Sequence, residues 1–458
     1  MTCRSFDCCV IRVSQSFDTI ALGHCWSRPV RGVPVMAEAE QGPSREALRD
    51  ATNGFFQKYG VAFVMVASVV GSGSIFIASS AGVQYGYALI WAFVGAALLG
   101  IMAQDMSARL GIFGEPLGAF MHRKLGGRLS MVVAAVISVG AVLWTIELTA
   151  ATAKGIEVLL NGAIGWQVLS IPIVILAILT GLLNYKGLEQ VLTATLFVLL
   201  AAYLVVAGVS TPPPVEVACG VIPSIPAPAA LTLAASILGS TAIWSNFFLE
   251  SNLVEEKSWT SAEDIPLMRK DLLFGYSLAM VLIVSVLVVT ATVIGGRSGL
   301  ESFITPALAL TRPIGQWAAV LFLFGTAAAA FNNIIPIMWV PAYLFEHARG
   351  KDADSADRSF KTIYVAGTAL GILAPVIAAT TRLGVIDMVV LFPAYNGIIS
   401  LPITAVLLFW ALNDEEVMGD RVNDLKLNAL NVLLVILAFG LAAISLPSLV
   451  RTLTSGGL

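Results

Sequence analysis

The chain has 458 residues, of which 57% are hydrophobic and 12% charged, and its formal net charge is −3. Because soluble proteins carry about 25% charged residues, this composition excludes an ordinary soluble domain and predicts an all-α membrane protein with many spans. The sequence has no basic stripe for nucleic acid and no P-loop, zinc-helix or GxSxG motif in a workable place. We therefore expect neither an ATP-driven pump nor an enzyme, no cofactor and no nucleic-acid partner.

Residues 1–56 differ in composition from the rest and are expected to form a cytoplasmic segment without a folded core. Four of the five cysteines lie in its first 25 residues, without the spacing of a metal site. A polar stretch typical of a cytoplasmic N-terminus begins at Met36. We expect that Met36 is the true start or that residues 1–35 are disordered, and that residues 57–458 form one transmembrane domain.

Eleven apolar segments are each long enough, at about 18 residues or more, to cross a bilayer. They are residues 60–80, 83–107, 129–160, 166–184, 189–209, 228–253, 270–295, 314–345, 361–380, 386–411 and 427–450. The loops between them alternate between rich and poor in Lys and Arg, and positive loops stay in the cytoplasm. This pattern predicts a protein of the cell membrane with its N-terminus inside and its C-terminus outside.

The first apolar segment is interrupted. It reads VAFVMVASVVGSGSIFIASSAGVQYGYALIW, and the run GSGS halts a helix halfway across the membrane. In hydrocarbon an unpaired backbone group costs several kcal/mol, so such a break is expected only where it lines a cavity or binds a solute. From this segment, the predicted transport site is lined by Gly71, Ser72, Gly73 and Ser74.

The sixth segment, ALTLAASILGSTAIWSNFFLE, has a polar interruption at its middle. Small and hydroxyl residues there either let helices pack closely or line the same site. The two interruptions lie five segments apart, which is the spacing of an inverted repeat of two five-helix halves with the site between them. From this segment, the predicted lining residues are Thr241, Trp244, Ser245 and Asn246.

Charged side chains inside the predicted spans are the next signal, because they are costly there and face a cavity or a partner. Glu147 and Lys154 share a face of the third segment, and Glu157 lies three residues further on. Glu250 lies deep in the sixth segment. These groups either form structural charge pairs or carry a coupling ion or proton, and we name Glu147, Lys154 and Glu250 as coupling candidates.

An amide pair in the eighth segment has two possible roles. Asn332 and Asn333 precede Pro336 in the run AAAAFNNIIPIMWVP. They either satisfy carbonyls that the proline leaves without a helical donor, or line the transport path.

Several stretches, among them GSGSIFIASSAGVQYGYALIW, AQDMSARLGI, NYKGLEQVLTATLFVLL and NDEEVMGDRVN, resemble the NRAMP family of proton-coupled divalent-metal transporters, over residues 57–450. The resemblance implies the leucine-transporter-type fold of the APC superfamily, with eleven or twelve helices and helices 1 and 6 unwound. It implies symport of a divalent cation of the Mn²⁺, Fe²⁺ or Mg²⁺ class with protons.

The chain departs from the family at the metal ligands. GSGS replaces the family's Asp-Pro-Gly-Asn, and IWSN replaces its Met-Pro-His-Asn. The second histidine of the family matches Glu250, and the carboxylates of its proton route fall on Ala153 and Ile156. None of the usual metal ligands remains, and hydroxyl, backbone and amide groups suit a magnesium-like ion that keeps most of its water, preferably beside a carboxylate.

A rival resemblance leaves the substrate open. The run GSGSIF is similar to the Gly-Ser-Gly-Ile-Phe break of amino-acid and polyamine transporters, where N–H groups at a half-helix N-terminus hold a carboxylate. The alternative substrate is therefore an amino acid, a carboxylate or another small anion. A third possibility is a transporter-like protein that only senses. In each case the expected partners are a small ion or solute and membrane lipid.

Overall fold

Every regular element in the described part of the chain is a helix. The computed structural model describes residues 69–183, 186–241, 244–256, 259–297, 299–300, 302–381 and 383–455. The predicted segment 1–56 and the predicted start at Met36 lie outside these residues. The main helices are α2 (Ser72–Tyr85), α3 (Ile90–Phe113), α4 (Leu117–Leu159), α5 (Trp166–Leu183), α6 (Lys186–Val209), α7 (Pro214–Cys219), α8 (Pro228–Thr241), α9 (Trp244–Glu256), α10 (Ile265–Ile294), α11 (Leu308–Ile314), α12 (Trp317–Ala348), α13 (Arg358–Ala369), α14 (Ala374–Thr381), α15 (Val385–Tyr395), α16 (Leu401–Leu412), α17 (Glu415–Met418) and α18 (Leu425–Ser455).

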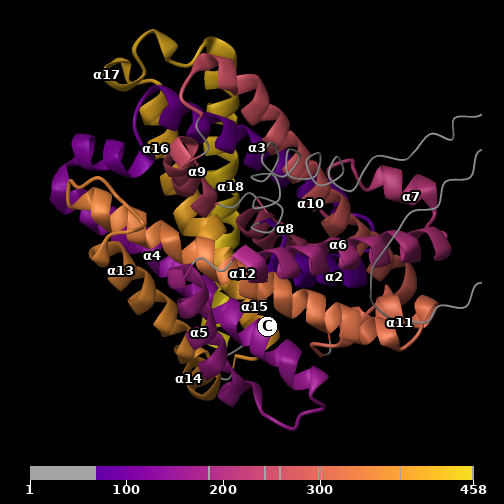
Figure 1. Cartoon of the computed structure of the whole chain (residues 1–458). Coiled ribbons are helices and arrows are strands. Elements are labelled where there is room, and N and C mark those ends of the chain that lie inside the picture. Colours follow the sequence, from indigo (N-terminus) through magenta and orange to yellow (C-terminus); the bar gives the residue numbers. More distant parts are fainter. Residues whose placement is uncertain are drawn as a thin grey trace, which may run out of the picture. The chain divides into compact units, whose positions relative to one another are not determined.

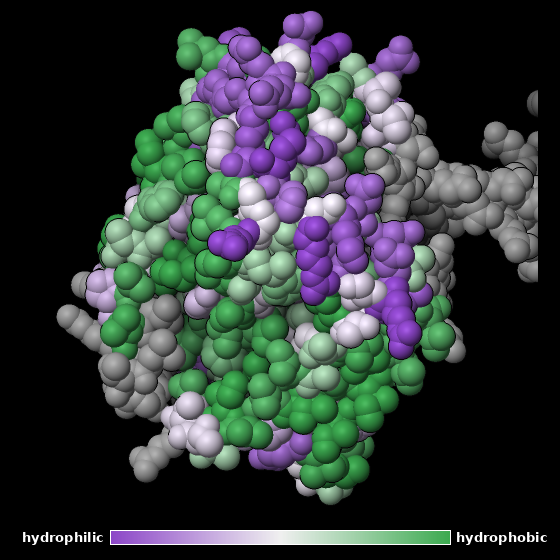
Figure 2. Space-filling model, turned by 90° about the vertical axis from the view of Figure 1, so that its left-hand side faces the viewer, coloured by the Kyte–Doolittle hydropathy of each residue, from purple (hydrophilic) through white to green (hydrophobic). Residues whose placement is uncertain are grey.

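Each of the eleven predicted spans coincides with helix in the described residues. Eight helical stretches in that part are long and apolar enough to cross a bilayer by length and composition. Three predicted spans remain. The first, 60–80, is described only from residue 69 and contains most of α2. The fifth corresponds to α6, and the sixth to the interrupted pair α8 and α9. Figure 2 shows that most of the lower part of one face is apolar, while hydrophilic residues gather toward the end that carries α17 in Figure 1. An apolar belt of this kind faces lipid.

Helix α4 continues well beyond the length that a bilayer requires. It has 43 residues, and Gly126 interrupts it with a φ of 73°. This left-handed conformation is open to glycine without steric cost, so the chain bends there between a short arm and the spanning part. The spanning part of α4 lies along α12.

The interrupted helix α2 lies inside the bundle. It packs against α8, α10, α12 and α15, which Figure 1 shows together in the middle of the molecule's helical part. Every residue from Ser72 to Val83 is buried. A helix that is surrounded on all sides needs no polar face, which explains why its apolar residues follow no amphipathic pattern.

A third irregular stretch faces α2 and α8. Helix α15 contains Pro393 and continues into a π-helical turn, Asn396–Ser400, before α16 begins. Helix α8 approaches this turn so closely that a Cβ on Gly239 would lie 2.4 Å from the carbonyl oxygen of Pro393. Only glycine permits this approach. The irregular parts of α2 and α15 and the glycine of α8 thus lie together in the core of the bundle.

Candidate transport site at the α2 break

The carbonyl groups that the break of α2 leaves without helical partners are satisfied by neighbouring donors. Ser74 Oγ donates to the carbonyl of Val69 at 2.8 Å. Asn333 Nδ2, from α12, donates to the carbonyl of Val70 at 3.3 Å and to a carbonyl of its own helix at 2.9 Å. The carbonyl of Gly71 accepts a backbone N–H of α2 at 3.3 Å. These three carbonyls are therefore occupied, and Asn333 fastens the break to α12.

A buried carboxylate lies beside the break. Glu147, from α4, is fully buried, and Ser72 Oγ donates a hydrogen bond to its Oε1 at 2.9 Å. Its other oxygen, Oε2, has no hydrogen-bond partner among the described residues. A Cβ on Gly73 would lie 3.7 Å from Glu147 Oε1. Because a buried charge without partners is costly, this carboxylate requires a bound cation or a proton.

The N-terminus of α2 points its backbone N–H groups into the same region. Its N-cap residue is Gly71, and no side chain caps the helix. The uncapped N–H groups and the helix dipole favour negative charge, and Glu147 already supplies it. An anionic solute bound at this helix end would therefore lie close to a carboxylate, which repels it.

Lys154 does not neutralise Glu147 in the described part of the chain. Its Nζ lies 2.5 Å from Glu157 Oε2, one helical turn along α4, and its side chain is 31% exposed. Of the two charge pairs that the sequence left open in this segment, the structure forms the one between Lys154 and Glu157. Glu147 instead contacts the break.

The residues that flank the interruption of α8 and α9 are partly described. Thr241 and Trp244 are fully buried. Thr241 Oγ1 and Trp244 Nε1 each have no hydrogen-bond partner among the described residues. The side chains of Ser245 and Asn246 lie outside the described residues, so their predicted place at the site stays a prediction.

Glu250 lies in a different environment, on α9, which packs against α3. It is buried and close enough to Tyr276 of α10 for electrostatic interaction. Gln104 Nε2, from α3, donates to the hydroxyl of Tyr276 at 2.9 Å. Sequence reasoning missed Gln104 and Tyr276, although a glutamine inside an apolar span is a usable signal.

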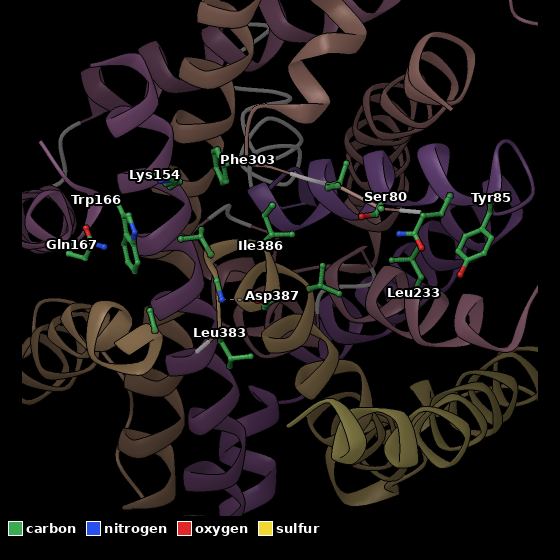
Figure 3. Close-up of a pocket in the computed structure, with 17 residues that line it drawn as sticks. Ser80, Tyr85, Lys154, Trp166, Gln167, Leu233, Phe303, Leu383, Ile386 and Asp387 are labelled. Carbon is green, nitrogen blue, oxygen red and sulfur yellow. Dashed lines mark hydrogen bonds between the residues drawn. The ribbon is translucent and has the colours of Figure 1, made fainter. Parts of the chain in front are cut away.

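A cavity of about 860 Å³ lies further along α2. Figure 3 shows Lys154 and Trp166 on one side of it and Ser80 and Tyr85 on the other, with Phe303 and Ile386 between them. Ser80 follows Ser72 by eight residues, which is about 12 Å along a helix. The cavity is wide enough for a hydrated ion. Along α2 its lining residue nearest the break is Ser80, and on α15 the lining reaches Val390.

Aromatic side chains separate the cavity from the break. Phe76, one turn along α2 from Ser72, has its ring centroid 4.5 Å from that of Phe303 and 6.3 Å from that of Phe322. All three rings are buried. Since Phe303 also lines the cavity, this aromatic cluster (Phe76, Phe303 and Phe322) lies on the path from the cavity to the site.

Comparison with known proteins identifies the family. A model described as natural resistance-associated macrophage protein-like matches residues 62–448. The chain belongs to this family. A divalent metal cation transporter, MntH, of Mycobacterium tuberculosis (strain CDC 1551 / Oshkosh) is 27% identical over 295 residues, and the match covers 60% of this chain and 66% of that relative's length. The chain thus spans somewhat less than two thirds of this relative.

Solved structures confirm the predicted fold class. A manganese transporter of Eremococcus coleocola superposes with a TM-score of 0.72 at 19% identity, covering 91% of this chain and 90% of that one. Mhp1, a nucleobase-cation-symport-1 family transporter, superposes with a TM-score of 0.57 at 16% identity, covering 87% of this chain and 92% of that one. This NRAMP-like chain therefore has the leucine-transporter-type fold.

Metal ligands of the usual side-chain kinds do not gather anywhere in the described residues. No group of three or more His, Cys, Asp or Glu side chains there is placed to hold a metal ion. In this NRAMP-like protein a metal at the break would be held by one carboxylate together with hydroxyl, carbonyl and water oxygens, which is an acceptable shell for a hard cation.

Proposed function

We propose that this protein is a secondary transporter that carries a divalent cation of the Mn²⁺, Fe²⁺ or Mg²⁺ class past the break of α2, together with protons. The observation that carries the proposal is the buried carboxylate of Glu147, which contacts the break through Ser72 and whose Oε2 has no hydrogen-bond partner among the described residues. The named activities of two similar proteins, a divalent metal cation transporter and a manganese transporter, support it.

Glu147 also links metal binding to pH. A buried carboxylate is stabilised either by a bound cation or by a proton, and a cation that binds it directly displaces the proton. Because the two compete at Glu147, a proton that moves together with the metal needs another group. Lys154, which pairs with Glu157, and Glu250, which lies near Tyr276, are the candidates for that role.

The charge of the loops supports an orientation for this transporter. The loops that are rich in Lys and Arg belong on the cytoplasmic side, which puts the N-terminus inside the cell and the C-terminus outside. In this orientation the end of α4 and the start of α15, which both line the large cavity, face outward. The cavity is then the external entrance, and the described state is open toward the outside.

The same contact argues against an anionic substrate. An uncapped helix N-terminus attracts anions. However, Glu147 contacts Ser72 at the start of α2 and would repel the carboxylate of a substrate. Lys154, a cation on the same helix as Glu147, is paired with Glu157 and is not shown to offset this repulsion. A divalent cation is attracted by Glu147, and the pairing of Lys154 with Glu157 lessens the repulsion between that lysine and the cation.

Replacing Glu147 by Gln tests the proposal. In proteoliposomes with an outside-acid pH gradient, the wild type is expected to take up Mn²⁺ or Mg²⁺, and Glu147→Gln to lose at least nine tenths of the uptake, because removing a carboxylate ligand costs several kcal/mol of binding. Glu157→Gln is the matched control, since the same change on the same helix removes only the partner of Lys154. Equal uptake by the wild type and Glu147→Gln contradicts the proposal.

A further inference from the structure

A carbonyl group in α15 lacks its ordinary helical donor. Pro393 lies inside this helix and has no backbone N–H. The residue four positions earlier is Val389, so its carbonyl oxygen does not receive the hydrogen bond that an uninterrupted helix would supply. Val389 is fully buried, and a buried carbonyl without a donor is destabilising unless another group binds it.

This carbonyl faces the α2 break and Glu147. A Cβ placed on Gly73 would lie 3.6 Å from Pro393 Cγ, 3.7 Å from Glu147 Oε1 and 3.8 Å from the carbonyl oxygen of Val389. The position that glycine leaves free is thus bordered by a carboxylate from α4 and a carbonyl from α15. Three helices meet there, and each contributes a residue that is unusual for a membrane span.

We infer that the carbonyl of Val389 is a metal ligand, and that together with Glu147 it makes this site selective for hard, oxygen-binding cations. The inference rests on the proposed function and adds the ligand and the metal class. Carboxylate and carbonyl oxygens are the donors that Mg²⁺ and Mn²⁺ prefer, whereas softer metals such as Cd²⁺ prefer sulfur and imidazole. Water completes the shell, because a small hard cation keeps several water molecules.

Filling the empty position tests the inference with little risk to the fold. The Cβ of a Gly73→Ala variant would make only ordinary contacts, none shorter than 3.6 Å, and its methyl group would take the space beside both oxygens. By calorimetric titration of the purified full-length protein with Mn²⁺, we expect Gly73→Ala to bind at least tenfold more weakly than the wild type. Gly95→Ala, in α3, is the control because a Cβ there meets nothing within 4 Å.

A second variant tests the carbonyl itself. Pro393→Ala restores an N–H four residues after Val389, which closes the helical hydrogen bond and withdraws the carbonyl from the site. Mn²⁺ affinity is expected to fall at least tenfold. Pro172→Ala in α5 is the matched control, since it also replaces a proline inside a membrane helix.

The outcomes separate this inference from the proposed function. If the wild type binds no divalent cation, the proposed function is overturned and the inference with it. If Glu147→Gln abolishes Mn²⁺ binding while Pro393→Ala leaves it unchanged, the function stands and the carbonyl is not a ligand. The order of metal affinities supplies a test that needs no variant. Tighter binding of Mn²⁺ and Mg²⁺ than of Cd²⁺ supports a site of oxygen ligands, and the reverse order overturns the inference.

Discussion

At the scale of single residues, the amide of Asn333 holds the α2 break in place. Its Nδ2 bridges the carbonyl of Val70 and that of Ala329 on its own helix, α12. Gly71 approaches the same amide so closely that a Cβ there would lie 3.3 Å from Nδ2. A protein donor thus satisfies the unwound backbone, and the site does not depend on a further ion to do so.

Asn333→Ala is expected to destabilise the protein and to lower uptake, because it leaves the Val70 carbonyl without a donor at a cost of about 1–3 kcal/mol. The measurement is the thermal unfolding midpoint in detergent together with initial uptake rates. Asn332→Ala is the control, since the neighbouring amide forms no hydrogen bond among the described residues. If the two variants behave alike, Asn333 does not have this role.

Most of the contacts that these single residues make could not be predicted from the sequence. The run GSGS and the buried Glu147 were recognisable singly, because each breaks an apolar pattern. That Glu147 contacts Ser72 depends on a contact between residues 75 positions apart, and no local pattern encodes it. Pro393 was visible in the tenth predicted span, but the direction of the carbonyl it frees follows only from how α15 packs on α2.

At the scale of elements, the aromatic cluster lies between the cavity and the break. Phe303 packs against Phe76 with its ring tilted and is 4% exposed, while it also borders the cavity. Aromatic pairs of this geometry contribute about 0.5–1.5 kcal/mol beyond the burial of their area. A contact of this strength opens readily, as a gate between solvent and site requires.

Phe303→Ala is expected to give water-soluble reagents easier access to the break. With the five native cysteines replaced by serine, a Ser72→Cys variant should react several times faster with an external methanethiosulfonate reagent when Phe303 is alanine. Ser80→Cys, which lies at the cavity, serves as the control and should react at the same rate in both backgrounds. An unchanged rate at position 72 argues against the gate.

A second contact between elements is a set of ion pairs that joins the short arm of α4 to the start of α17 and the residue before it. Lys124 Nζ lies 2.6 Å from Asp414 Oδ2 and 2.7 Å from Glu416 Oε2. Asp414 also caps α17 by accepting the backbone N–H of Glu416 at 3.1 Å. Burial opposes ionisation of Asp414, but the hydrogen bond and charge of Lys124 outweigh it and hold the pKa of Asp414 below its usual value.

This contact should weaken in acid. Because the pKa of Asp414 is lower in the folded protein than in the unfolded chain, its stabilisation is present above about pH 4 and is lost as the pH falls through the folded value. Asp414→Asn should therefore lower the unfolding midpoint at pH 7, and its effect should shrink as the pH falls below about 4. Glu415→Gln, an exposed neighbour, is the control. An effect of Asp414→Asn that does not change with pH contradicts this account.

At the scale of the whole molecule, the prediction from sequence was most successful. The eleven apolar segments, their charge-alternating loops and two interruptions five segments apart led to the leucine-transporter-type fold that the comparisons confirm. Length and periodicity determine spans because a bilayer allows only internally satisfied backbone. Which loops face the cytoplasm and where residues 1–56 lie stay predictions.

The fold explains why a family member can lose its usual ligands and keep a site. The irregular parts of α2 and α15 meet in the core, where a carboxylate of α4 and a carbonyl of α15 border the break. In this chain the negative charge at the break belongs to Glu147 of α4, and α2 itself carries no acidic residue there. We propose that this relocated carboxylate binds the transported metal.

The most direct test is a crystal structure of the full-length protein with Mn²⁺, measured for anomalous scattering at the manganese edge. We expect one strong peak at bonding distance from Glu147 Oε2, with the carbonyl oxygen of Val389 in the same shell, and no such peak in crystals of Glu147→Gln. A manganese peak that lies elsewhere and persists in Glu147→Gln would show that Glu147 does not bind the metal.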